Sequence, residues 1–294
     1  MCDADTLQDT IEYQLRNALS RRHFGALTLG AGLTTMLAPV VRGDELAVTE
    51  SEVEIHTPDG TADAYFVHPS KGSHAAVLVW PDIFGLRPAF RQMGKRLAES
   101  GYAVLVVNPY YRRQRAPVAP EHANFDDPAT QAALMSLRNS LTPATTQTDA
   151  VAFVQWLDAQ PSVDRHKRMA TTGYCMTGPF TLQTAAALPE RVGAGASFHG
   201  GGLVTDKPDS PHLLIPKMKT RGFLIAIAES DDKRQPEAKD VLREAFAKAS
   251  LPAEIEVYPD TIHGWCPIDA KVYNHDQAER AWSRMLVLFK SALT

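Results

Sequence analysis

The sequence predicts an α/β fold in which a doubly wound, mostly parallel sheet carries helices on both faces. Three observations support this prediction. Short apolar runs alternate with longer helical stretches along the chain, and this alternation favours parallel strands joined by helices. The hydrophobic fraction of 44% is typical of a chain with a full core. Setting aside residues 1–44 leaves residues 45–294, about the length of one α/β domain.

The expected elements follow in order along the chain. Residues 51–57 and 61–68 alternate apolar and polar side chains around a Pro-Asp-Gly turn, which predicts a hairpin. Further strands are expected at residues 75–80, 102–107, 168–173, 192–198, 222–228 and 253–258. Helices are expected at residues 88–99, 144–159, 177–188, 236–249 and 275–292. Residues 110–143 form a long connection with little regular structure, which is typical of a lid or a substrate loop.

A single cysteine, Cys175, lies where a predicted strand passes through a glycine-flanked turn, GYCMTG, into a helix. This is the context of the nucleophile elbow in the α/β-hydrolase fold. The turn lifts the sulfur above the sheet and points the first N–H groups of the helix at the same place, which favours a thiolate and an oxyanion site. The alternative is that Cys175 is a small buried apolar side chain.

Two later predicted strands end in an acidic side chain and a histidine, the groups that a thiol nucleophile needs as orienting acid and base. The first leads into Asp231 and Asp232, and the second leads into a loop that carries His263. Nucleophile, acid and histidine in this order are typical of α/β-hydrolases, and the carboxyl ends of parallel strands meet at one edge of the sheet. A Cys175–Asp231–His263 triad is therefore predicted, with Asp232 left open as the acid. The alternatives are that Asp231 and Asp232 belong to a solvated turn and that His263 is a loop histidine without a catalytic role.

Two further segments follow the first two buried strands, WPDIFG at residues 80–85 and NPYYR at residues 108–112. Together with the predicted triad, they give residues 52–292 a resemblance to the dienelactone hydrolase family, the carboxymethylenebutenolidase-like α/β-hydrolases. The resemblance implies an oxyanion hole built from the backbone N–H groups of Ile83 and Met176. It also implies that Asp82 replaces a glutamate that keeps the resting thiol protonated. Arg112 matches an arginine that binds the carboxylate of the substrate.

The sequence departs from that family pattern at three positions. Thr177 replaces a glycine after the nucleophile and is expected to add bulk beside the site. Asp82 is one methylene shorter than the glutamate, and Pro267 stands where a second substrate-binding arginine is expected. Arg113 or Arg115 could supply the missing charge, although a surface position is expected for both.

The residue types predict a hydrolase that cleaves a lactone or a carboxylic ester through a thioester intermediate on Cys175. No cofactor is expected, and no metal is expected because the histidines lack the paired spacing of metal ligands. One of these histidines, His199, is expected at a strand end close to the site. A general carboxylesterase or thioesterase is the nearest alternative. Two further alternatives are a ligand-binding protein without catalysis and a redox protein built on Cys175 and Cys266.

Near the N-terminus the pair Arg21 and Arg22 precedes an uncharged run at residues 25–41, followed by Arg42. This resembles a bacterial twin-arginine export signal, which predicts a periplasmic or exported protein that meets the twin-arginine export machinery. There are two alternatives: the signal stays uncleaved and anchors the protein in the inner membrane, or the segment is a soluble helix of a cytoplasmic protein. Residues 1–44 are therefore kept apart from the domain.

Composition limits the partners of the chain. The formal net charge of −4 provides no basic surface, so nucleic acid is not an expected partner. Three cysteines do not suggest a disulfide framework. The expected partner is a small-molecule ester or lactone, and the expected state is a monomer or a small homo-oligomer.

Overall fold

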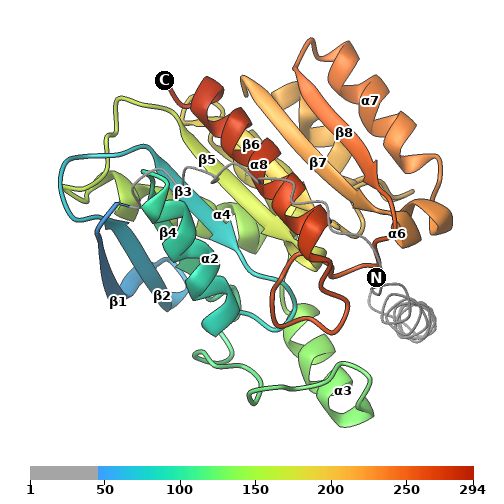
Figure 1. Cartoon of the computed structure of the whole chain (residues 1–294), viewed down its shortest axis with the longest axis horizontal. Coiled ribbons are helices and arrows are strands. Elements are labelled where there is room, and N and C mark those ends of the chain that lie inside the picture. The colour runs from blue at the N-terminus through green and yellow to red at the C-terminus, as the bar shows by residue number, and fades with distance from the viewer. Residues whose placement is uncertain (1–45) are drawn as a thin grey trace, which may run out of the picture.

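The computed structural model describes residues 46–294, so the predicted export signal and its alternatives lie outside the described residues. The described chain forms one eight-stranded sheet in the order β1-β2-β4-β3-β5-β6-β7-β8 (Figure 1). The predicted fold class is confirmed. Within residues 46–294, no helix has both the length and the apolar character needed to cross a membrane.

The strands lie close to their predicted positions. The hairpin strands β1 and β2 are antiparallel, β2 is antiparallel to β4, and all other neighbours are parallel. The bounds are β1 Val48–Thr57, β2 Gly60–Pro69, β3 Ala76–Trp80, β4 Ala103–Val107, β5 Met169–Tyr174, β6 Val192–Phe198, β7 Gly222–Ala228 and β8 Ala253–Tyr258. The five residues of β3 and the five of β4 are all buried, which explains why these strands appear in the sequence as short apolar runs.

Helices cover both faces of the sheet. Figure 1 looks onto the face covered by α2 (Pro88–Glu99) and α8 (His275–Ala292). The other face packs against α4 (Pro143–Asp158), α5 (Gly178–Ala187) and α7 (Ala238–Lys248). Successive side chains of a strand point to opposite faces. Val77 and Val79 of β3 accordingly join the α2/α8 core, while its Leu78 and Trp80 join the other.

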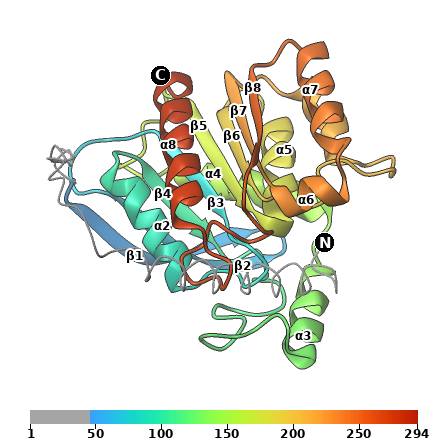
Figure 2. The same ribbon diagram turned by 45° about the vertical axis from the view of Figure 1, so that its right-hand side comes forward.

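The connection at residues 110–143, expected to be irregular, contains one helix, α3 (Pro128–Arg138). Asp127 caps its first turn by accepting a hydrogen bond from the Thr130 N–H, and proline occupies the first helical position. Leu134 is the only buried residue of α3, and the helix stands apart from the sheet layers in both views (Figure 2). Three short elements were not predicted from the sequence: η1 (Cys175–Thr177), η2 (Pro211–Lys217) and α6 (Glu229–Arg234).

The strand order determines where a ligand site can form. The chain passes from β3 to β4 on one side and then returns to place β5 on the other side of β3. Connections therefore leave β3 and β5 in opposite directions and open a crevice at their carboxyl ends, the usual ligand site of an open α/β sheet.

Candidate active site

The structure brings Cys175, His263 and Asp231 together at the carboxyl ends of β5, β8 and β7. His263 Nε2 lies 3.0 Å from Cys175 Sγ. On the other side of the ring, His263 Nδ1 lies 2.8 Å from Asp231 Oδ2. Asp232 points elsewhere and accepts a hydrogen bond from Lys239 Nζ at 2.7 Å. Of the two aspartates left open by the sequence, Asp231 is the one that contacts the histidine.

The turn at Cys175 is strained and closely packed. Cys175 has φ of +57°, a left-handed conformation that costs energy in a residue with a Cβ and that recurs at functional sites. A Cβ on Gly173 would lie 2.2 Å from the Thr177 carbonyl oxygen. A Cβ on Gly178 would lie 2.5 Å from the Ser197 Oγ and equally close to the Gly200 Cα. Both flanking glycines are therefore required by the close approach of neighbouring backbone.

Thr177 stabilises this turn from inside the protein. Its hydroxyl donates to the Trp80 carbonyl oxygen at 2.8 Å and accepts from the Tyr174 N–H at 2.9 Å. The side chain is fully buried and does not line the cavity described below. The expectation that Thr177 adds bulk beside the site is wrong, because the hydroxyl turns inward to join the ends of β3 and β5.

The loops that carry the acid and the histidine are bonded to each other by two hydroxyl side chains. Ser230 Oγ accepts a hydrogen bond from the His263 N–H at 3.0 Å. Thr261 Oγ1 accepts from the Glu229 N–H at 3.1 Å and donates to the Tyr258 carbonyl oxygen at 2.7 Å. These contacts fix the separation of Asp231 and His263. The sequence analysis did not identify this pair, although both hydroxyls lie within two residues of a predicted site residue.

His199 contacts the backbone of Cys175. It is fully buried at the end of β6 with φ of +40°, and its Nδ1 accepts the Cys175 N–H at 3.1 Å. Burial and the neighbouring His263 ring, 5.3 Å away, hold the pKa of His199 well below its ordinary value. A neutral ring that accepts at Nδ1 carries its proton on Nε2. His199 therefore supports the strained backbone of Cys175 without adding a charge.

The electrostatics of the triad favour a protonated histidine. Burial by itself lowers the pKa of His263, but the Asp231 carboxylate and the Cys175 sulfur on its two sides raise that pKa to about 10. An opposite charge within hydrogen-bond distance favours the charged form of a titratable group. The arrangement therefore favours an imidazolium beside a thiolate as the resting pair.

Ile83 and Met176, the predicted oxyanion donors, lie on either side of the buried Tyr110. The Tyr110 hydroxyl donates to the Ile83 carbonyl oxygen at 2.9 Å and lies 3.3 Å from the Met176 sulfur. Met176 belongs to the first turn after Cys175, where backbone N–H groups have no acceptor within the helix. Tyr110 thus ties the two segments that carry the predicted donors together, a role that the sequence analysis did not assign.

A cavity of about 960 Å³ opens beside Cys175 and His263. Three segments form its walls: residues 82–92, residues 116–131 and residues 264–272. The first follows β3, the second precedes and includes the start of α3, and the third follows the histidine. Cys175 and His263 therefore face a partly open space large enough for a small molecule.

Asp82 lines this cavity, but its carboxylate is held by an arginine. Arg87 NH1 donates to Asp82 Oδ1 at 2.6 Å, and Arg87 NH2 donates to Asp82 Oδ2 at 2.9 Å. The Phe84 N–H donates to Asp82 Oδ1 at 2.9 Å. The structure thus corrects the expectation that Asp82 keeps the Cys175 thiol protonated, because both oxygens of Asp82 are bonded to Arg87, a residue that was not singled out from the sequence.

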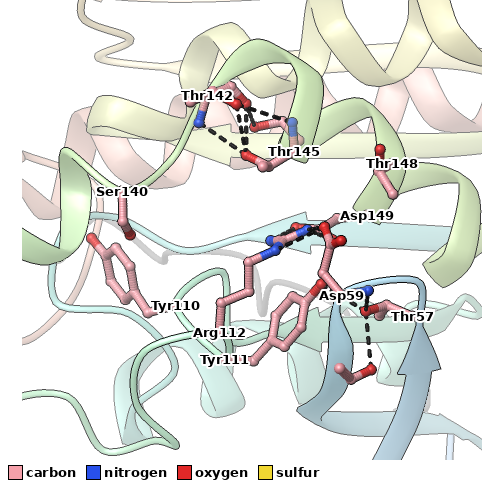
Figure 3. Close-up of polar contacts among 12 residues, drawn as sticks. Thr57, Asp59, Tyr110, Tyr111, Arg112, Ser140, Thr142, Thr145, Thr148 and Asp149 are labelled. Atoms are coloured by element: carbon pink, nitrogen blue, oxygen red, sulfur yellow. Dashed lines mark hydrogen bonds and ion pairs between the residues drawn. The ribbon is translucent and has the colours of Figure 1, made fainter.

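Arg112, expected to bind a substrate carboxylate, does not line the cavity. Figure 3 shows its guanidinium between two aspartates. It donates to both oxygens of Asp149 at 2.7 Å and to Asp59 Oδ2 at 2.6 and 3.0 Å. Tyr111 and Thr57 complete the cluster, in which the Tyr111 hydroxyl donates to Asp149 at 2.7 Å. The structure therefore corrects the expected position of Arg112, because its charge joins the β1–β2 hairpin to α4.

Arg113, Arg115 and Cys266 do not line the cavity. Arg115 pairs with Glu54 on the surface, and Arg113 is exposed. Neither Cys175 nor Cys266 forms a disulfide within residues 46–294, and burial raises the pKa of Cys266 well above its ordinary value. Within residues 46–294, no group of three or more His, Cys, Asp or Glu side chains is arranged to hold a metal ion.

Comparisons with known proteins agree with this fold. A sequence model described as the dienelactone hydrolase family matches residues 62–293. A carboxymethylenebutenolidase of Rhodococcus opacus is 28% identical over 243 residues, which cover 80% of this chain and 89% of that protein. A Klebsiella pneumoniae structure described as a "Putative Dienelactone Hydrolase" aligns with a TM-score of 0.71 and 25% identity, over 83% of this chain and 99% of that one. A dienelactone hydrolase structure from Anabaena variabilis shares the fold, with a TM-score of 0.60 and 14% identity over 84% and 99% of the two chains.

Proposed function

The chain belongs to the dienelactone hydrolase family, and from the geometry of its site we propose that it cleaves a carboxylic ester or lactone through attack by Cys175. One observation carries the proposal. The Cys175 sulfur lies 3.0 Å from His263 Nε2, and 2.8 Å separate His263 Nδ1 from the Asp231 carboxylate. A nucleophile, a base within hydrogen-bond reach and a third group that orients the base are the parts needed for acyl transfer.

In the first half of the proposed reaction, the Cys175 thiolate attacks the carbonyl carbon of the substrate. The oxyanion that forms is held by the N–H groups of Ile83 and Met176, and losing one such donor typically costs about 10²–10³-fold in rate. When the tetrahedral intermediate collapses, the bond to the leaving oxygen breaks. The His263 imidazolium gives its proton to that oxygen, which departs as an alcohol and leaves a thioester on the sulfur.

In the second half, neutral His263 takes a proton from a water molecule as that water attacks the thioester carbon. The second tetrahedral intermediate expels the Cys175 thiolate, and the carboxylic acid product leaves. The imidazolium beside the thiolate is then restored. Asp231 fixes the ring so that Nε2 faces the sulfur, and it stabilises the charge that His263 carries in the resting state.

The proposal is tested with the full chain as wild type, Cys175→Ala and Cys266→Ala. The substrates are a carboxylate-bearing dienelactone and 4-nitrophenyl acetate. We expect Cys175→Ala to reduce kcat by about 10⁴-fold or more, as removal of a nucleophile does in related triads. Cys266→Ala, the matched control at the other cysteine of residues 46–294, is expected to retain turnover.

The pattern of substrates separates the alternatives. Turnover of the simple ester alone places the protein among general carboxylesterases or thioesterases, which use the same nucleophile. If Cys175→Ala hydrolyses both substrates as fast as the wild type, Cys175 is not the nucleophile. If the wild type hydrolyses neither, a ligand-binding protein becomes the better account.

We also propose that residues 1–44 act as a twin-arginine export signal and that the protein works in the periplasm. The support is the pair Arg21 and Arg22 before the uncharged run at residues 25–41. Replacing both arginines by lysine in a bacterial host is expected to leave the protein in the cytoplasmic fraction. The same distribution for the variant and the wild type would contradict the export proposal.

A further inference from the structure

We propose that the cavity beside Cys175 takes uncharged, largely apolar esters and discriminates against substrates that carry a carboxylate. The inference rests on the proposed ester hydrolysis and adds the substrate class. Arg87 lines the cavity, and it is the positively charged side chain closest in sequence to Asp82. Whether an incoming carboxylate finds a binding partner depends on whether the charge of this arginine is available.

All five N–H donors of Arg87 are bonded, since NH1 also donates to the Gly85 carbonyl oxygen at 3.5 Å, and none is free for a third anion. Its NH1 and NH2 bond the two oxygens of Asp82, and its Nε and NH2 bond the two oxygens of Asp269 at 2.6 and 2.9 Å. The faces of the guanidinium lie near the rings of Phe84 and Phe90, at 5.4 and 4.9 Å from their centroids. One positive charge between two carboxylates leaves the group with a net negative charge.

The other arginine and the lysine that line the cavity are also paired with carboxylates, as His263 is with Asp231. Arg91 bonds Glu52 on β1, and Lys271 bonds Asp126 at 3.1 Å. Four carboxylates line the same space, and they are Asp82, Glu121, Asp126 and Asp269. Together with the distant position of Arg112, this means that each cation lining the described cavity already has a carboxylate partner. A substrate anion would enter a space whose fixed charges sum to a negative value.

The rest of the lining suits apolar groups. Phe84 and Phe125 meet edge to face at 6.4 Å and join two walls of the cavity. The other apolar lining residues include Ile83, Leu86, Pro117, Ile268 and Val272. A carboxylate that moves into such a space loses its hydration without gaining a charged partner, which disfavours its binding. An alkyl or aryl group of the same size gains from leaving water.

Two substrates of matched shape test the inference. They are 4-nitrophenyl methyl adipate, which is uncharged, and 4-nitrophenyl hydrogen adipate, which carries a carboxylate at the end of the same chain. The full-length wild type is expected to show a kcat/KM for the uncharged ester at least about tenfold above that for the anion, as expected for one unpaired charge near a like charge at an effective dielectric constant of about 20. Equal or higher kcat/KM for the anion would overturn the inference.

Asp269→Asn identifies the cause. It removes one negative charge from Arg87 and frees one donor, because the asparagine amide keeps a single acceptor oxygen, so it is expected to raise the anion-to-neutral ratio of kcat/KM by about tenfold. Glu121→Gln is the matched control, because it removes a carboxylate of the same cavity that does not bond Arg87; a change of about twofold or less is expected. Equal effects of both substitutions, or none from Asp269→Asn, would overturn the role of Arg87.

The same assay keeps the two proposals separable. If Cys175→Ala abolishes turnover of both adipates while the wild type prefers the anion, the ester hydrolase remains and the substrate class fails. If no turnover depends on Cys175, the proposed hydrolase itself fails.

Discussion

The cavity has two sides that are built differently. The floor consists of the strand ends that carry Cys175, Asp231 and His263, where the neighbouring side chains are buried and hydrogen-bonded to one another. The roof, residues 113–141, contains α3 and has only Val118 and Leu134 buried. Regions with few buried apolar contacts open locally at low free-energy cost. We therefore expect the proposed chemistry to depend on the rigid floor and substrate entry to depend on opening of the roof, while selection against a carboxylate rests with Arg87 and its two aspartates.

The largest expected effect is at the floor. Asp231→Asn removes the carboxylate that orients His263 and is expected to lower kcat by about 10⁴-fold, the scale seen for this change in serine-histidine-aspartate enzymes. The measurement is steady-state hydrolysis of 4-nitrophenyl acetate by the full chain. Asp232→Asn, which loses only a pair with Lys239, is the control and is expected to stay within about threefold of the wild type. Similar losses in both variants would contradict the distinct role of Asp231.

A smaller effect on the floor is expected at His199, a positioning residue. His199→Ala leaves the buried Cys175 N–H without its acceptor, and an unsatisfied buried donor costs about 1–3 kcal/mol. We expect kcat to fall by about 10- to 100-fold with little change in KM. His199→Asn restores an acceptor near the position of Nδ1 and is expected to recover part of kcat. No difference between the alanine and asparagine variants would show that the hydrogen bond does not matter.

The raised pKa of His263 gives a prediction for stability. Because the folded-state pKa of about 10 exceeds the unfolded value of about 6.5, the charged histidine stabilises the folded protein fully below pH 6.5. This contribution is lost as the pH rises through about 10. The difference in unfolding free energy between the wild type and Asp231→Asn is therefore expected to shrink from pH 7 to pH 10 in urea titrations. A difference that stays constant or grows would contradict the charged pair.

Two leucines compare the core that supports the floor with the roof. Leu97 of α2 and Leu134 of α3 are both about 1% exposed. Leu97→Ala is expected to cost about 2–5 kcal/mol of global stability because it leaves a cavity in the core. Leu134→Ala is expected to loosen the roof alone, raising KM about threefold to tenfold while Tm changes by less than about 2 °C. Equal losses of Tm in both variants would show that the roof unfolds together with the core.

The sequence predicts the floor better than the roof, for a physical reason. Strand ends and the glycine-flanked turn are local patterns, so the positions of Cys175 and His263 follow from short segments. The start of α3 also had a local signal, since Asp127 precedes a proline, but the segment as a whole lacked a clear apolar period. The partners of Arg112 were not predictable, because Asp59 and Asp149 lie 53 and 37 residues away in the chain.

The central claim, attack by Cys175, is tested most directly by trapping the acyl-enzyme. The full chain is mixed with 4-nitrophenyl methyl adipate, quenched in acid within milliseconds to seconds and analysed by intact mass and peptide mapping. The account predicts one acyl group per chain, attached to the peptide that contains Cys175, together with a burst of 4-nitrophenol of equal size. Steady turnover with no adduct, or an adduct on any other residue, would contradict it.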